Sequence, residues 1–220
     1  MFNRIARRYD AANRLLSAGQ DVIWRRKCAR EVPGDRPLTV LDLATGTADV
    51  LKTLLRRRRN IRVAVGLDPA KEMLAIARRK LAGNGSLLNG DAQCIALRDH
   101  SVDIVCMAFG IRNVANVEKA LREMLRVLVA GGKLLILEFS LPQNSAIRKI
   151  YLCYFRHVLP VIGGLIAGDH GAYSYLNRTV EEFPAGEAFC ARLQLAGFTR
   201  IKAHSLTFGI ATLYSAETRP

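Results

Sequence analysis

Residues 38–140 alternate between strand-like and helix-like runs, and this alternation restricts the fold more than any other feature of the chain. The apolar run 38–44 precedes the run 48–59, whose apolar side chains recur at helical spacing, namely Val50, Leu51, Leu54 and Leu55. The same order of strand and helix repeats downstream with short connections. Repeats of this kind form a parallel sheet that helices cover on both faces.

The remaining runs complete the predicted sheet. We expect further strands at 62–68, 85–91, 102–109 and 131–140, and helices at 70–81, 117–128 and 186–198. Two alternating runs, 199–206 and 209–217, end the chain, and the short link Thr207-Phe208 suits a hairpin of antiparallel strands. The sequence therefore predicts an α/β fold with a mostly parallel seven-stranded sheet and an antiparallel C-terminal edge.

The chain is expected to form a single domain, residues 1–220, because its apolar fraction of 50% supports one sizeable core and no linker divides it. Two segments fall outside the alternation. Residues 1–30 are expected to form an N-terminal helical cover, and residues 141–185 a helical insertion on the substrate side, after the fifth strand. Connections of this length in a compact domain usually cover a functional site.

Positive charge is concentrated in the first part of the chain. The formal net charge is +14, and residues 1–80 hold 19 Lys and Arg against 8 Asp and Glu, whereas residues 81–220 hold 14 against 11. Such an excess favours an anionic partner, which is nucleic acid, an anionic membrane surface or an acidic cofactor. The alternative is that arginine-rich runs such as 54–60 complement helix dipoles and are simply solvated.

Cysteine and histidine residues carry no metal-binding pattern. The five cysteines include no Cys-x-x-Cys pair, and the four histidines are scattered. Cys153 and His157 stand four positions apart, but two candidate ligands do not make a metal site. No apolar leader is recognisable in the first residues, so we expect a cytosolic protein with reduced thiols and no metal.

Polar residues stand at the carboxyl ends of the predicted strands, where an open parallel sheet binds its ligand. Gly46 and Thr47 follow the first strand, and Thr47 offers a hydroxyl and a backbone N–H at the start of a helix. Taken alone, this loop also fits an ordinary strand-to-helix turn. Asp68 ends the second strand, where a carboxylate can accept both ribose hydroxyls of a nucleoside cofactor.

Asp91 follows the third strand, where a carboxylate can accept the exocyclic amine of adenine, and Ala92 adjoins it. An acidic residue in this place distinguishes S-adenosylmethionine enzymes from NAD-dependent dehydrogenases, which share only the position of Asp68. S-adenosylmethionine carries a methionine group where NAD carries a pyrophosphate. A loop that binds it therefore does not need the strict Gly-x-Gly-x-x-Gly pattern. We therefore predict that Gly46, Thr47, Asp68, Asp91 and Ala92 bind S-adenosyl-L-methionine.

Motifs across nearly the whole chain resemble the menaquinone/ubiquinone C-methyltransferases (UbiE/MenG type) of the class I, Rossmann-like, S-adenosylmethionine-dependent fold. The matching stretches include "FNRIARRYDAANRLLS" (2–17), "VLDLATGTAD" (40–49), "AFGIRNV" (108–114), "MLRVLVAGGKLLILEFS" (124–140) and "YSYLNRTVEEFP" (173–184). The chain departs from the family pattern where Asp21 replaces a usual His and where Thr45 and Ala48 replace glycines. The two loop changes are expected to stiffen the turn and to keep the cofactor site.

The resemblance implies C-methylation of a demethylquinol that carries a polyprenyl tail: demethylmenaquinol in the first place, with the benzoquinol of the ubiquinone pathway as a further acceptor. Loss of the phenolic proton makes the neighbouring ring carbon nucleophilic, and that carbon attacks the sulfonium methyl group in line. Arg112 is assigned to lowering the phenol pKa, Asn113 to orienting the ring oxygens, and Tyr9 to completing the network. Tyr9 belongs to the N-terminal segment, which folds over the pocket in this family.

Alternatives stay open for several of these assignments. Arg112 could instead form a salt bridge to a strand-end carboxylate such as Glu138, and Trp24 could be a core residue rather than a substrate contact. The substrate could be another small molecule or RNA. The motifs that nucleic-acid methyltransferases carry after the fourth strand are, however, replaced here by "AFGIRN" (108–113).

The partners that we expect are the polyprenylated quinol and an anionic membrane surface, with no nucleic acid. The basic residues of 1–80 and the apolar side chains around Leu165 and Ile166 are expected to hold a cytoplasmic enzyme peripherally on the inner face of the membrane. The sequence leaves open the quinone precursor, the tail length, the proton acceptor and whether the enzyme is a homo-oligomer.

Overall fold

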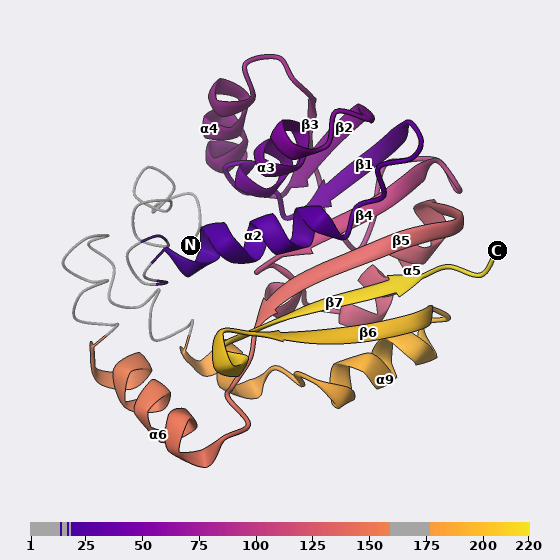
Figure 1. Ribbon diagram of the computed structural model, residues 1–220. Helices are drawn as coiled ribbons and strands as arrows, with labels where there is room; N and C mark the ends of the chain where they lie inside the picture. The colour runs from indigo at the N-terminus through magenta and orange to yellow at the C-terminus, as the bar shows by residue number, and fades with distance from the viewer. Residues whose placement is uncertain (1–13, 15–16, 18, 159–176) are drawn as a thin grey trace.

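A computed structural model describes residues 14, 17, 19–158 and 177–220 (Figure 1). Its strands are β1 (Leu38–Leu43), β2 (Ile61–Asp68), β3 (Ser86–Asn89), β4 (Val102–Ala108), β5 (Leu128–Phe139), β6 (Thr199–Leu206) and β7 (Ala211–Glu217). They form one sheet in the order β3-β2-β1-β4-β5-β7-β6, in which β7 is antiparallel to both of its neighbours. The other strand pairs are parallel, so the predicted sheet and its antiparallel C-terminal edge are confirmed.

Helices cover both faces of the sheet, as Figure 1 shows. One face carries α2 (Gln20–Arg30), α3 (Asp49–Arg57) and α4 (Lys71–Leu81), and the other carries α5 (Val117–Val127) and α9 (Glu187–Leu195). After β5 come α6 (Ser145–Cys153) and the π-helical turn η2 (Tyr154–Val158), and residues 177–182 are also helical. Two 3-10 turns, η1 (Ile111–Asn113) and η3 (Thr207–Gly209), follow β4 and β6.

The core forms two layers because successive residues of a strand point to opposite faces of the sheet. In β4, Ile104 and Cys106 pack with residues of α2 and α3, whereas Val105 and Met107 pack with residues of α5 and α9. Cys106 is fully buried in the first of these layers. The two layers fix the strand ends relative to one another, and the strand ends carry the polar residues of the site.

Most elements begin or end within three residues of their predicted bounds, and two differences change the connections of the sheet. β5 begins at Leu128, earlier than the predicted 131–140, because the chain passes from α5 directly into the strand and Leu128 pairs with Val102. The connection between β6 and β7 is longer than the two residues predicted, since the turn η3 and Ile210 lie between the strands.

Some predicted features fall outside the described residues. Tyr9 of the N-terminal cover and Leu165 and Ile166 of the insertion belong to this group. The cover is described at Arg14, Ser17 and from Gly19 onward. None of the helices in the described ranges combines the length and the apolar character that crossing a membrane requires.

Candidate functional site

A cavity of about 340 Å³ opens beyond the carboxyl ends of β1, β2 and β4. Its lining includes five of the eight residues that the sequence assigns to the site, namely Gly46, Asp68, Asp91, Ala92 and Asn113. Apolar side chains complete the wall, including Met73, Met107, Phe109 and Val114. The fold therefore gathers residues from four separate loops around one hollow, at the edge of the sheet where the sequence placed them.

The loop between β1 and α3 turns sharply within a few residues. Ala44, Gly46 and Ala48 have positive φ values of 49°, 56° and 66°. Glycine adopts this left-handed conformation freely, whereas an alanine there is disfavoured by about 1–2 kcal/mol. Ala48 stands where the resemblance expects a glycine, so this chain accepts backbone strain at that position while keeping the turn.

Asp68 is held at the cavity wall by two backbone donors. The N–H of Gly46 donates to Oδ2 at 2.8 Å, and the N–H of Ala70 donates to Oδ1 at 2.7 Å. Burial raises the pKa of Asp68, and the two N–H donors oppose that increase. Each carboxylate oxygen accepts more than one hydrogen bond, so Asp68 can still receive the two hydroxyls of a ribose.

Asp91 lies at the rim of the cavity and is fixed by its own turn. The backbone N–H of Gln93 donates to Oδ1 at 2.8 Å, and the side-chain amide of Gln93 approaches both oxygens at 3.2 and 3.1 Å. Ala92, between them, is buried and also lines the cavity. The turn thus presents an acceptor beside an apolar surface, which suits the amine edge of adenine.

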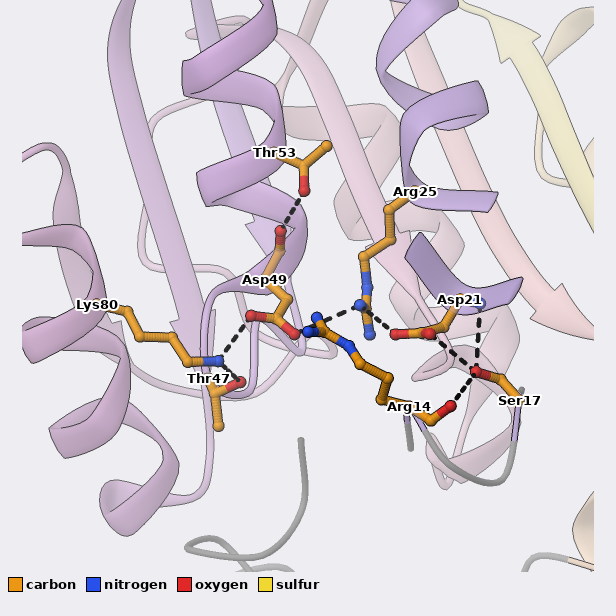
Figure 2. Close-up of polar contacts among 8 residues, drawn as sticks. All are labelled: Arg14, Ser17, Asp21, Arg25, Thr47, Asp49, Thr53 and Lys80. Carbon is orange, nitrogen blue, oxygen red and sulfur yellow. Dashed lines mark hydrogen bonds and ion pairs between the residues drawn. The ribbon is translucent and has the colours of Figure 1, made fainter. Parts of the chain in front are cut away.

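Thr47 lies in the loop between β1 and α3, which we call the cofactor loop because the sequence assigns Gly46 and Thr47 to the cofactor. It is absent from the lining of the cavity as described. Its hydroxyl accepts a hydrogen bond from Lys80 Nζ at 2.8 Å, and Lys80 Nζ also lies 2.6 Å from Asp49 Oδ1 (Figure 2). The side chain is therefore turned toward α4. What Thr47 can present to a ligand in this arrangement is its backbone N–H.

An ion network continues from Asp49 to the N-terminal helix, as Figure 2 shows. Arg25 of α2 lies 3.4 Å from Asp49 Oδ2 and 2.6 Å from Asp21 Oδ2. Ser17 Oγ donates to the other oxygen of Asp21 at 2.8 Å. Asp21, which stands where the resemblance expects a His, therefore serves as the buried partner of Arg25 and ties the described start of the cover to the cofactor loop.

Arg112 is paired with a buried carboxylate. Its Nη1 donates to Glu138 Oε1 at 2.6 Å and to the backbone oxygen of Phe109 at 2.8 Å. Glu138 is fully buried, and a buried carboxylate needs a charged partner. The alternative that the sequence left open, a salt bridge to Glu138, is therefore present. Arg112 Nε nevertheless stays buried without a hydrogen-bond partner in the described structure, and Arg112 does not itself line the described cavity.

Asn113 follows Arg112 and does line the cavity. Its side-chain oxygen is buried and has no hydrogen-bond partner among the described residues. A buried acceptor left unpaired costs free energy, which a hydroxyl donor from a ligand would recover. Arg112 Nε and Asn113 Oδ1 thus provide one unused donor and one unused acceptor on successive residues.

Trp24 belongs to the core rather than to the cavity wall. It is 2% exposed, and its ring lies 6.0 Å from the rings of both Phe109 and Phe139. The sequence analysis did not identify the apolar lining, although Met107 and Phe109 stand at the end of β4 and Val114 directly follows η1. Their place at a strand end was the signal that could have identified them.

Asp42 lies behind the cofactor loop at the end of β1. Burial raises its pKa to about 7, and a hydrogen bond from Thr45 Oγ1 at 2.6 Å opposes that increase. Asp42 is therefore a titrating group next to the site. Within the part of the chain that the structure describes, no group of three or more His, Cys, Asp or Glu side chains is arranged to hold a metal ion.

Comparison with known proteins decides the family. A model of the ubiE/COQ5 methyltransferase family matches residues 1–217. The chain belongs to this family. The resemblance and the enzyme class that the sequence predicted, a methyltransferase, are thereby confirmed.

Individual relatives of this ubiE/COQ5 family member align with nearly the whole chain. A demethylmenaquinone methyltransferase of Thermus thermophilus is 47% identical over 220 residues, which cover 99% of both chains. A ubiquinone/menaquinone biosynthesis C-methyltransferase UbiE of Geobacter sulfurreducens is 46% identical over 99% of this chain and 86% of its own length.

Solved structures support the fold. A structure from Thermotoga maritima, described as an S-adenosylmethionine-dependent methyltransferase and possible histamine N-methyltransferase, aligns with a TM-score of 0.72 over 99% of this chain and 98% of its own. Its sequence is only 18% identical, so the similarity supports the fold and not the activity. The predicted class I, Rossmann-like methyltransferase fold is confirmed.

Proposed function

We propose that this enzyme transfers the methyl group of S-adenosyl-L-methionine to a ring carbon of a polyprenylated demethylquinol, with demethylmenaquinol as the preferred acceptor. The full-length family match and the names of the relatives support C-methylation in quinone biosynthesis. The observation that carries the proposal is the pair of unused polar atoms on Arg112 and Asn113, next to a cavity that also holds Asp68. A phenolic hydroxyl in the cavity can donate to Asn113 Oδ1, and the adjacent residue Arg112 supplies the positive charge.

S-adenosyl-L-methionine fits the donor side of the cavity. Asp68 retains acceptor capacity for the ribose hydroxyls, Asp91 and Ala92 form the adenine end, and the loop at Gly46 brings backbone close to the ligand without a side chain. The backbone of Thr47, at the start of α3, completes this set. When bound, the cofactor supplies an electrophilic methyl group on a sulfonium.

Residues of this chain would then prepare the acceptor. The positive charge of Arg112 lowers the pKa of the phenol, because it favours the phenolate. Glu138 holds the guanidinium in place through the 2.6 Å contact, and Asn113 orients the ring oxygens. Phe109 and Met107 form a dry wall, which keeps water from competing for the methyl group. Tyr9 is proposed to complete this network from the N-terminal cover.

The enzyme is further proposed to act from the cytoplasm on the inner face of the membrane. A polyprenyl tail keeps the acceptor in the bilayer, so the ring must be reached at the membrane surface. The net charge of +14 supports this placement, because anionic lipid attracts a basic protein.

The direct test is a methyl-transfer assay with S-adenosyl-L-methionine and two acceptors, reduced demethylmenaquinone and the reduced benzoquinone precursor. We expect methylation of the naphthoquinol and less or none of the benzoquinol. The oxidised quinones are the matched controls, because they have no phenolic proton to lose and should stay unmethylated. Absence of transfer to either quinol would refute the proposal.

Replacing Asp68 by alanine is expected to weaken binding of S-adenosyl-L-methionine by about 1–3 kcal/mol, since two hydrogen bonds to a charged acceptor are lost. Titration calorimetry measures the change directly. Asp99→Ala is the control, because Asp99 is exposed and pairs with Arg126 away from the cavity. Unchanged affinity in Asp68→Ala would contradict the assignment of Asp68 to the ribose.

A further inference from the structure

The turn between β6 and β7 holds an aromatic ring out into solvent at a cost in strain. Phe208 is 77% exposed. Thr207, Phe208 and Gly209 have φ values of 46°, 57° and 92°, and two of these three left-handed residues are not glycine. An exposed aromatic ring makes no packing contacts within this fold that could offset the strained backbone. A strained and exposed apolar residue is typical of a site that binds a partner.

This turn is rigidly anchored on both sides. Thr207 Oγ1 accepts from Trp24 Nε1 at 2.8 Å and donates to Gln20 Oε1 at 3.1 Å, which fixes the turn to the first residues of α2. Ser140 Oγ donates to the backbone oxygen of Gly209 at 2.7 Å, which fixes it to the end of β5. Phe208 is therefore presented by a fixed support.

Two other apolar side chains are exposed on the elements that flank this turn. Ile23 of α2 is 43% exposed and directly precedes Trp24, and Ile150 of α6 is 72% exposed. A Cβ placed on Gly209 would lie 3.1 Å from Cα of Pro142, shortly before α6, so the turn also adjoins that segment. Figure 1 shows the turn between the start of α2 and α6, at one end of the molecule.

The exposed charges on α2, α6 and β6 have one sign. On α2, Arg26, Lys27 and Arg30 follow Ile23 at helical spacing and are exposed with it. The single acid of α2, Asp21, is buried against Arg25, and α6 and β6 contain no acid. We call the docking edge the set of exposed residues Ile23, Arg26, Lys27, Arg148, Lys149, Ile150 and Phe208.

We propose that the docking edge binds an anionic bilayer surface, with the Phe208 ring at the boundary between headgroups and acyl chains. Basic side chains match anionic headgroups, and an aromatic ring is favoured at that depth. RNA would satisfy the charges but offers no apolar interior for Ile23 and Ile150. The inference rests on the proposed function, because the cavity opens at the carboxyl ends of the strands, the same end of the sheet as this turn.

The test is co-sedimentation of the full chain with neutral phosphatidylcholine vesicles and with vesicles that contain phosphatidylglycerol. Phe208→Asn should weaken binding to the anionic vesicles about tenfold, because roughly half of the transfer free energy of a Phe side chain is lost. Asparagine tolerates a positive φ, so thermal stability should be kept or raised. Leu195→Ser is the matched control, since Leu195 is 89% exposed on α9, outside the docking edge, and should bind like the parent.

A second variant separates charge from apolar contact. Lys27→Glu with Lys149→Glu should reduce binding strongly at low salt and little at high salt, where headgroup attraction is already screened. Binding by Phe208→Asn equal to the parent, an equal loss in Leu195→Ser, or preference of the parent for RNA over anionic vesicles would each overturn the proposal. Methyl transfer to a short-tailed quinol in solution should be unchanged in Phe208→Asn. If the parent protein also fails to methylate the short-tailed quinol, the proposed function is refuted. The vesicle experiment then still decides whether the docking edge binds an anionic bilayer.

Discussion

Replacement of Arg112 by alanine is expected to lower turnover by on the order of 100- to 1,000-fold, the range typical of removing one electrostatic group from a reaction site. The same change should also lower the free energy of unfolding by about 3–5 kcal/mol, because it strands a buried carboxylate. The side chains of Arg112 and Glu138 are 8% and 0% exposed, so water cannot replace the lost partner. Affinity for S-adenosyl-L-methionine should change little, since Arg112 does not line the described cavity.

Two further variants separate the catalytic effect from the structural one. Arg112→Lys keeps the charge and should keep most of the stability, but it loses the planar guanidinium and should recover turnover only in part. The double variant Arg112→Met with Glu138→Gln removes both charges together, so stability should return while turnover stays low. Single-turnover rates measure the catalytic effect, and thermal unfolding measures the effect on stability. Near-normal turnover in the double variant would leave Arg112 with a purely structural role.

Replacement of Asp42 by asparagine is expected to make the protein more stable at pH 8 but not at pH 4. The folded-state pKa of Asp42 is about 7, above its ordinary value of 3.8, because the carboxyl is buried. Between these two values the folded state binds a proton that the unfolded state has lost, so stability falls as pH rises through that window. The loss amounts to as much as about 4 kcal/mol for this group.

Asparagine carries no titrating proton, so Asp42→Asn should lack this slope. The measurement is urea unfolding of parent and variant at pH 4, 6 and 8, and the informative quantity is the difference between the two at each pH. Exposed Asp99 supplies the control variant Asp99→Asn. A difference for Asp42→Asn that stays constant with pH would contradict a raised pKa.

The sheet and the donor side of the site were predictable from the sequence for a local reason. In a parallel α/β fold, the residue that ends a strand is read directly from the hydrophobic pattern, and all parallel strands end at the same edge. Asp68 and Asp91 therefore had to approach one another once their strands were recognised. The position of Gly46 followed in the same way, because it opens the connection from β1 to α3.

Other features depend on contacts between distant residues. The sequence around Arg112 did not show whether its side chain pairs with Glu138 or contacts the substrate. In the structure the guanidinium pairs with Glu138, and its Nε has no hydrogen-bond partner among the described residues. The orientation of Thr47 follows from Lys80, 33 positions away. The outward position of Phe208 follows from the positive φ values of the turn. The alternation of apolar and polar residues, from which β6 and β7 were predicted, contains no information on these values. Tyr9 stays a prediction.

Asp49 is shared by cations from two different helices, and it is also the first residue of α3, directly after the cofactor loop. The loop and the N-terminal helix are therefore thermodynamically linked, since a ligand that steadies the loop steadies Asp49 and, through it, Arg25. Such linkage is reciprocal: the factor by which a loosened α2 weakens ligand affinity equals the factor by which bound ligand protects α2 from opening. We therefore expect α2 to open less often when the pocket is occupied, although none of its residues lines the described pocket.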